Sequence, residues 1–248
     1  MPRSLPSLVM TGLLAGCSLT VLAHADLVVL DSIAHGTLYE STGSQSANGL
    51  GAHLFAGNNG QDLSRRGLLR FDVASLGSDV VVHGATLRLH VSQANAQAVE
   101  VSMHRVITDW GVGSTDAPGG EGGGGPATPG SATWTHAFWD DTPWTNAGGD
   151  FADPATATSL VGGTGWYEWS GAGLVADIQA MLDGDAPDFG WILLGDESGP
   201  SSAKRFDSRL AELGLRPELV VDFSVVPAPP AIAMLAFART GRRRRHGH

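Results

Sequence analysis

The stretch Ala85-Thr86-Leu87-Arg88-Leu89-His90-Val91 decides the fold class, because its apolar and polar side chains alternate without a break. Successive side chains of an extended chain point to opposite faces, so the four apolar residues share one face and the three polar residues share the other. Residues 99–104 repeat this alternation. One dry and one wet face are typical of antiparallel sheets, and we therefore expect an all-β chain.

Outward from this strand, period-2 patterning and turn signals continue through most of the chain. Further strands are predicted at residues 26–30, 37–40, 53–56, 65–73, 189–194, 204–208 and 218–224. A helix is predicted at residues 172–182, where apolar residues recur with helical spacing and Gly184 is placed to end it. The Gly/Pro-rich segment 119–130 is predicted to be a surface insertion that does not pack. These elements predict a jelly-roll-like β-sandwich of antiparallel strands with one short helix.

The composition and the charge distribution exclude two classes of protein: disulfide-stabilised folds and nucleic-acid-binding proteins. Cys17 is the only cysteine among 248 residues, which rules out a disulfide framework. All 25 acidic residues lie between residues 26 and 226, together with only 9 of the 15 basic residues. This part of the chain therefore has a formal charge of −16 and repels phosphate backbones, which excludes nucleic acid as its partner.

Residues 1–25 resemble a secretory signal peptide, with Arg3, a mostly apolar run at 8–22 and the small-x-small site Ala23-His24-Ala25. A rival interpretation is a lipobox, because Leu14-Ala15-Gly16-Cys17 matches the bacterial pattern in which the cysteine carries the lipid. A retained buried helix is the third option. Both of the first two interpretations export the protein, and whether Cys17 is lipidated or removed stays open.

Residues 225–248 resemble a PEP-CTERM sorting signal of the Val-Pro-Ala-Pro type. Val226-Pro227-Ala228-Pro229-Pro230 precedes an apolar run at 231–238 and the cluster Arg242 to Arg245. Arginines after an apolar run stay on the cytoplasmic side of a membrane. The resemblance implies recognition by membrane-embedded sorting machinery. The run of eight residues is shorter than the roughly 20 residues of a membrane span, so a disordered basic tail is the alternative.

Between the two ends, residues 26–224 carry an ordered set of short motifs. They are Arg66-Gly67-Leu68-Leu69-Arg70-Phe71-Asp72, Gly84-Ala85-Thr86-Leu87-Arg88-Leu89, His104-Arg105-Val106 with Asp109-Trp110, Ala132-Thr133-Trp134, Trp144 with Gly148-Gly149-Asp150, Phe206-Asp207-Ser208-Arg209 and Arg216-Pro217-Glu218-Leu219. The set resembles the DNRLRE domain family, which is similar to a carbohydrate-binding module group reported to bind acidic polysaccharide such as alginate. The resemblance implies an extracellular jelly-roll accessory module. Leu210 departs from the family, which usually has Glu there, and this weakens any role for a carboxylate at that position.

Tryptophans are the first candidates for ligand contact, because flat indole rings stack on sugar faces. Four of them lie in or beside loop-like sequence: Trp110, Trp134, Trp139 and Trp144. The alternative is that each fills the core or the base of a loop. Trp166 and Trp169 are predicted to be core residues of a strand.

Arginines are the second candidates. Arg66 and Arg70 share one face of a predicted strand, and with Arg88 on a neighbouring strand they are predicted to form a basic stripe on an outer sheet face. Guanidinium groups bind carboxylated sugars through paired hydrogen bonds. The alternative is pairing with the many acidic residues of the chain itself.

No motif requires a cofactor, and the metal ligands stay unknown. A structural Ca²⁺ is an option, because aspartates near turns supply the oxygen ligands that this ion prefers. The candidate ligands are Asp31, Asp62, Asp150, Asp153 and Asp222. A second metal option arises if His90 and His104 lie on paired strands.

We therefore expect a secreted or cell-surface, non-catalytic module of a Gram-negative-type bacterium that binds polysaccharide, with acidic glycans favoured. Its partners would be a polysaccharide or exopolysaccharide matrix and the sorting machinery, with membrane contact only through the C-terminal tail or a lipidated Cys17. A structural matrix or biofilm protein without a small ligand is the second hypothesis. A polysaccharide lyase or hydrolase is the third, although the sequence contains neither a His-Glu-x-x-His nor a Gly-x-Ser-x-Gly motif.

Overall fold

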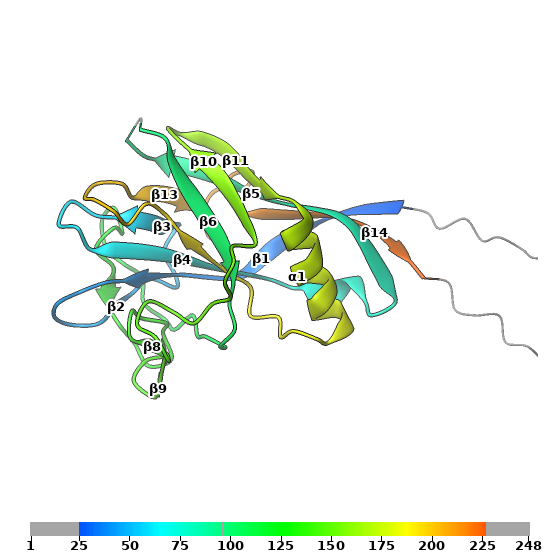
Figure 1. Cartoon of the computed structure of the whole chain (residues 1–248). Coiled ribbons are helices and arrows are strands. Elements are labelled where there is room, and N and C mark those ends of the chain that lie inside the picture. The colour runs from blue at the N-terminus through cyan, green and yellow to red at the C-terminus, as the bar shows by residue number, and fades with distance from the viewer. Residues whose placement is uncertain (1–24, 96, 227–248) are drawn as a thin grey trace, which may run out of the picture. The chain divides into compact units, whose positions relative to one another are not determined.

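The structure, a computed structural model, describes residues 25–95 and 97–226, which belong to one compact unit (Figure 1). The strands are β1 (Ala25–Tyr39), β2 (Ser46–Ala47), β3 (His53–Asn58), β4 (Ser64–Phe71), β5 (Val80–Gln93), β6 (Val99–Arg105), β7 (Gly125–Pro126), β8 (His136–Phe138), β9 (Thr142–Pro143), β10 (Ala157–Val161), β11 (Gly165–Ser170), β12 (Trp191–Leu194), β13 (Lys204–Asp207) and β14 (Glu218–Val225). The helices are the 3₁₀ helix η1 (Val73–Leu76) and α1 (Ala172–Asp183). The predictions for the signal peptide, for Cys17 and for the tail after Val226 lie outside the described residues.

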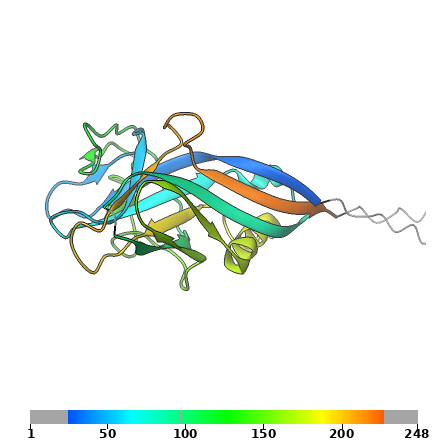
Figure 2. The ribbon, with the colours of Figure 1, turned by 90° about the horizontal axis from the view of Figure 1, so that it is seen from above.

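All strand pairs are antiparallel, and most belong to two main sheets joined by β1 and β3. The pairs β2–β7 and β8–β9 form two small separate sheets. In the first sheet, β5 pairs with β11 on one edge and with β14 and β13 on the other, and β14 pairs with the first half of β1. Figure 2 shows β1, β14 and β5 running side by side. In the second sheet, the order is β1, β4, β12, β6 and β10. The predicted all-β class with antiparallel strands and one short α-helix is confirmed.

β1 belongs to both sheets. Its residues 25–31 pair with β14, and its residues 32–39 pair with β4, with an irregularity between Ser32 and Ala34. The strands predicted separately at 26–30 and 37–40 are therefore one strand. The strand predicted at 65–73 ends at Phe71, because Val73 begins η1.

The main hydrophobic core draws side chains from both sheets. Leu87, Leu89 and Val221 come from the first sheet, while Phe71 and Met103 come from the second. From Ala85 to Val91 of β5 the burial alternates residue by residue, as the sequence predicts. Burying apolar area of this kind is the main force that holds such sheets together.

Helix α1 packs Leu174 and Ile178 into this core. It ends at Gly184, whose left-handed conformation lets its backbone N–H return to the carbonyls of Ala180 and Met181. Both the helix and its terminating glycine match the prediction. Among the described residues, no helix is long and apolar enough to cross a membrane.

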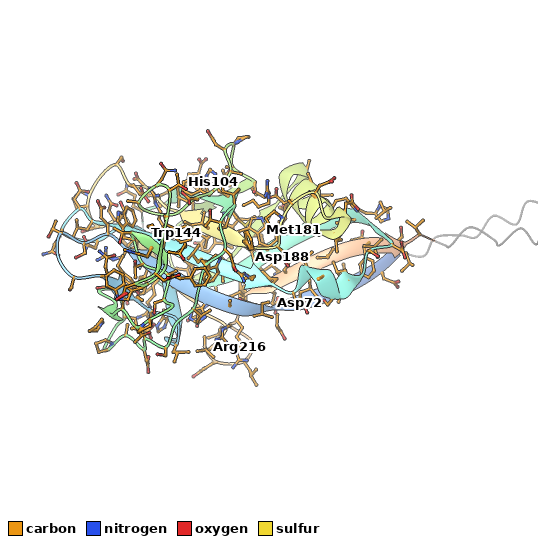
Figure 3. All side chains as sticks on the ribbon, turned by 90° about the horizontal axis from the view of Figure 1, so that it is seen from below. Asp72, His104, Trp144, Met181, Asp188 and Arg216 are labelled. Carbon is orange, nitrogen blue, oxygen red and sulfur yellow. The ribbon has the colours of Figure 1, made fainter. Side chains whose placement is uncertain are left out.

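A second hydrophobic cluster lies on the outer face of the second sheet. Leu38, Leu68 and Ile192 project from the strands, and the segment between β6 and β10 covers them with Trp110 and Trp144. Figure 3 labels Trp144 within this segment. The outer face of the second sheet is therefore largely covered by protein.

Candidate functional site

A groove of about 500 Å³ lies at the end of the first sheet where β3 turns into β4 and β5 turns into β6. This end of the sheet is at the left of Figure 1, and the end where β1 begins and β14 finishes is at the right. Its lining includes Phe55, Arg65, Gln93, Asn95, Glu121 and Arg205. We call it the Arg205 groove.

The alternation of β13 places Arg205 in this groove. Phe206 enters the main core, so Arg205 faces outward, where it lies opposite Phe55 of β3 and Gln93 of β5. Its Nε donates a hydrogen bond to Ser92 Oγ at 3.1 Å. None of the hydrogen bonds within residues 25–95 and 97–226 uses its two terminal nitrogens, so they are available to a ligand.

A second cation, Arg65, lies on the same lining. Arg65 is buried and stacks on the ring of Tyr39 at 5.1 Å, and its Nε donates to the carbonyl of Gly122 at 3.0 Å. Lys204 does not line the groove: it is fully buried, and its Nζ donates to the carbonyl and amide oxygens of Asn95. Burial lowers the pKa of both cations.

In the described part of the chain, no carboxylate forms an ion pair with Arg65, Lys204 or Arg205. The charged residues on the lining are Arg65, Arg205 and Glu121, so the groove has one more cation than anion in a part of the chain that is otherwise rich in acidic residues. Such a site favours an anionic group.

Glu121 holds one wall of the groove in place. Its Oε1 accepts hydrogen bonds from the backbone N–H of Ala52 and from His53 Nδ1, and its Oε2 accepts from the N–H of His53 and from Asn48 Nδ2, at 2.8–3.1 Å. The prediction that segment 119–130 does not pack is therefore wrong. A carboxylate reaching back to β3 anchors the segment, and a local glycine count cannot reveal that contact.

The acidic groups beside the groove are committed to structure. Glu121 uses both oxygens for the contacts above, and Asp207 lies between His90 Nδ1 at 2.6 Å and His53 Nε2 at 3.6 Å. A general acid or base needs a carboxyl group that is free to reach the substrate. The groove therefore supplies binding groups rather than an evident acid–base pair.

Two of the four candidate tryptophans are interior residues. Trp110 and Trp144 are only 2% and 5% exposed, and their indole N–H groups donate to the carbonyls of Phe189 and Thr133 at 2.8 Å. The prediction of a sugar-stacking platform is wrong for these two, because their ring faces are packed in the second cluster.

Trp134 and Trp139 are half-buried in the same covering segment. The guanidinium of Arg66 lies 4.9 Å from the ring centre of Trp134, and the ring of Trp139 meets His136 edge-on at 4.8 Å. Both rings are therefore more accessible than those of Trp110 and Trp144, but neither belongs to the lining of the Arg205 groove.

The three candidate arginines do not form one stripe. Arg66 and Arg70 share β4 in the second sheet, whereas Arg88 lies on β5 in the first sheet. Arg66 pairs with both oxygens of Glu197 at 2.8 Å, and Arg70 pairs with Asp109. The alternative of internal pairing applies to both.

Arg88 also pairs internally, with Glu218 at 2.6 Å and Glu168 at 3.3 Å, and it lies 5.0 Å from the ring centre of Trp166. Trp166 is 36% exposed, so its predicted place in the core is wrong, whereas Trp169 is fully buried as predicted. Trp166 lies opposite His90 on the outer face of the first sheet, the same sheet that ends in the groove.

The metal options receive no geometric support. Among the described residues, no group of three or more His, Cys, Asp or Glu side chains could hold a metal ion. Burial alone would raise the pKa of Asp150, but hydrogen bonds from the N–H groups of Thr145 and Asn146 hold it below its usual value. His90 and His104 lie on β5 and β6, which belong to different sheets and do not pair.

The sequence reasoning passed over Arg205. The available signal was the pair Lys204-Arg205 in a predicted strand, because alternation must turn one of two adjacent basic residues outward. Arg65 is harder to find, because its role depends on Gly122, which is 57 positions away.

No protein-family model matches the chain, and no curated protein matches it.

Proposed function

We propose that residues 26–224 form a secreted or cell-surface, non-catalytic module with a jelly-roll-like β-sandwich fold that binds polysaccharide through the Arg205 groove. The expected ligand is an acidic glycan. In this proposal, the resemblance to the DNRLRE family supplies the class of ligand, and the groove supplies the place where it binds.

One observation carries the proposal. Arg205 presents two terminal guanidinium nitrogens to an open groove, although residues 26–226 as a whole have a formal charge of −16. A guanidinium fits a carboxylate through two parallel hydrogen bonds. The side-chain amide of Gln93 lies on the same lining and matches sugar hydroxyls. We expect a modest affinity, with Kd of roughly 10⁻³–10⁻⁵ M.

A structural matrix or biofilm protein without a small ligand is the second candidate. The burial of Trp110, Trp144, Trp169 and Trp191 favours it, because these large rings serve the interior. Under either proposal, residues 1–25 direct export. The tail 225–248 then brings the chain to the sorting machinery, and membrane contact is limited to that tail or to a lipidated Cys17.

The test is a titration of the full chain with oligosaccharides rich in uronic acid and with a neutral oligosaccharide of equal length. Arg205→Gln should weaken binding of the acidic ligand at least tenfold, because it removes the charged hydrogen-bond donors. The matched control is Arg216→Gln, which makes the same charge change outside the groove, where Arg216 donates to the Ala211 carbonyl. Repeating the titration with EDTA tests the Ca²⁺ option.

Two results would count against the proposal. Absence of binding to every acidic glycan would exclude the ligand class. Equal loss in Arg205→Gln and Arg216→Gln would show that only net charge matters and that the groove is not the site.

A further inference from the structure

A second groove, of about 810 Å³, runs between β5 and α1. One wall is the β5 segment 81–86, and the other is the face of α1 that carries Ala172, Val175 and Ala176. In Figure 1, α1 lies beside β5 and β11, close to the end of the sheet where β14 finishes. We call it the β5–α1 groove.

One wall of this groove is an open strand edge. β14 pairs with β5 from Val80 to Arg88 on one side. On the other side, β11 pairs only from Thr86 to Val91 and ends at Ser170. The chain then turns at Gly171 and enters α1, which leaves the β5 edge from Val80 to Ala85 without a neighbouring strand.

The side chain of Gln179 makes hydrogen bonds to the β5 edge like those that a neighbouring strand would make. Its Oε1 accepts a hydrogen bond from the Val82 N–H at 2.9 Å, and its Nε2 donates to the Val80 carbonyl at 3.2 Å. A peptide backbone laid along this edge would offer the same acceptor and donor. Val80 and Val82 therefore present to the groove the backbone acceptor and donor that an added strand would use.

The lining of the groove defines the chemistry of such a strand. No Asp, Glu, Lys or Arg side chain lines it, and His83 is its one titratable residue. The walls are otherwise small and mostly apolar, so they accept uncharged, small or β-branched side chains. An edge of six residues is about 20 Å long at roughly 3.3 Å per residue, which suits a peptide of five or six residues.

We propose that the β5–α1 groove binds an extended, uncharged peptide segment of another protein, which adds to the first sheet as a strand beside β5. Three observations support this proposal. A strand that continued the line of β11 beyond Ser170 would lie in the groove, and Gln179 already makes hydrogen bonds to the β5 edge that such a strand would make. In addition, no Asp, Glu, Lys or Arg side chain lines the groove. The proposal is independent of polysaccharide binding, because the two grooves share no lining residue.

The experiment uses the ¹⁵N-labelled full chain and the blocked peptide Ac-KAVTVAK-NH₂, whose lysines lie at its ends for solubility. Binding is expected with Kd on the order of 10⁻⁴ M, with the largest amide shift at Val82, whose N–H faces the groove. Two further peptides carry backbone N-methyl groups on every second residue, in opposite phases. An added strand directs alternate N–H groups to its partner, so one phase should bind and the other should lose binding at least tenfold.

Variants of the chain add a second line of evidence. Ala176→Trp should fill the groove and weaken binding at least tenfold, because Ala176 is exposed and has room for a larger side chain. Leu160→Trp, at an exposed position on β10, is the matched control and should bind as the native chain does. Gln179→Ala should tighten binding severalfold, because the peptide no longer competes with that amide.

Equal binding of the two N-methylated peptides would overturn the proposal, because it would show docking without strand addition. Absence of binding in both the native chain and Gln179→Ala would also overturn it. The two N-methylated peptides are tested on the native chain, so this result does not depend on whether a variant folds.

Discussion

At the scale of single residues, burial decides what the ionisable side chains do. His35 is fully buried on β1, and its Nε2 donates to the Gly51 carbonyl at 3.0 Å, while Nδ1 has no partner among the described residues. Burial, assisted by the charge of Arg209, lowers the pKa of His35 from 6.5 to about 4. The ring is therefore neutral in the folded protein at pH values where an exposed histidine would carry a proton.

Because His35 is buried, we predict that the free energy of unfolding decreases at acid pH. Between pH 6.5 and about 4, the unfolded chain binds the proton that folded His35 rejects, so the free energy of unfolding falls as the pH drops through this window. The loss attributable to His35 should reach about 3 kcal/mol. His35→Gln keeps a donor for the Gly51 carbonyl but does not titrate, so its urea-unfolding free energy should depend less steeply on pH. The control is His136→Gln, and equal slopes for His35→Gln and the native chain would contradict the assignment.

The contacts of each arginine likewise decide whether its charge is used inside the protein or is available to a ligand. Arg66, Arg70 and Arg88 each combine an ion pair with an aromatic ring about 5 Å away, so their charges serve internal packing. Arg205 makes no such pair within the described residues and is free to act outward. The contact partners, and not the residue type, separate the structural arginines from the candidate binding arginine.

At the scale of elements, most of the side-chain hydrogen bonds that hold the segment after Pro118 involve Glu121. Glu121 has a positive φ of 64° and accepts four hydrogen bonds from Asn48, Ala52 and His53, while its own carbonyl accepts one from Tyr39 Oη at 2.9 Å. Segment 118–123 is therefore fastened to β3 and to β1, and it presents a defined wall to the Arg205 groove.

We predict that Glu121→Gln destabilises the protein by about 2 kcal/mol, because the new amide donor faces existing donors and leaves them unsatisfied. Urea denaturation measures the change, and hydrogen exchange at the amides of Ala52 and His53 should accelerate. Glu212→Gln, at an exposed position, is the control and should change stability by less than about 0.5 kcal/mol. Similar stability of the two variants would show that Glu121 does not fasten the segment.

At the scale of the whole molecule, the charge balance governs how an acidic ligand approaches. Residues 26–226 have a formal charge of −16, whereas the Arg205 groove is a small positive site within that field. A polyanion is therefore repelled at long range and attracted only at close range. Salt screens the long-range part, because the Debye length falls from about 30 Å at 0.01 M to about 8 Å at 0.15 M.

From this balance we predict that the association rate of an acidic oligosaccharide rises between 0.01 M and 0.15 M salt. This is opposite to the behaviour of a basic polyanion-binding protein. Stopped-flow or surface-plasmon kinetics on the full chain measures the rate, with a neutral oligosaccharide as the control. An association rate that falls steeply with salt would show that the long-range field at the binding site is positive, contrary to the charge distribution.

The amino-acid sequence by itself determined the features that depend on near neighbours. The alternation of 85–91 and 99–104 predicted β5 and β6, and helical spacing with Gly184 predicted α1 and its end. These predictions are correct because a two-residue or 3.6-residue period reports which face of an element is buried, whatever packs against it. The same reasoning placed Trp169 in the core.

Only the tertiary structure decided which residues meet across long sequence separations. It buried Trp110 and Trp144 beneath their own segment, separated Arg88 from Arg66 onto another sheet, and fastened Glu121 to a strand 68 positions away. The exposure of an indole ring or a guanidinium depends on what the fold brings over it. A residue's immediate neighbours do not carry that information, so the accessible cation at Arg205 and the open edge of β5 emerge only from the packed structure.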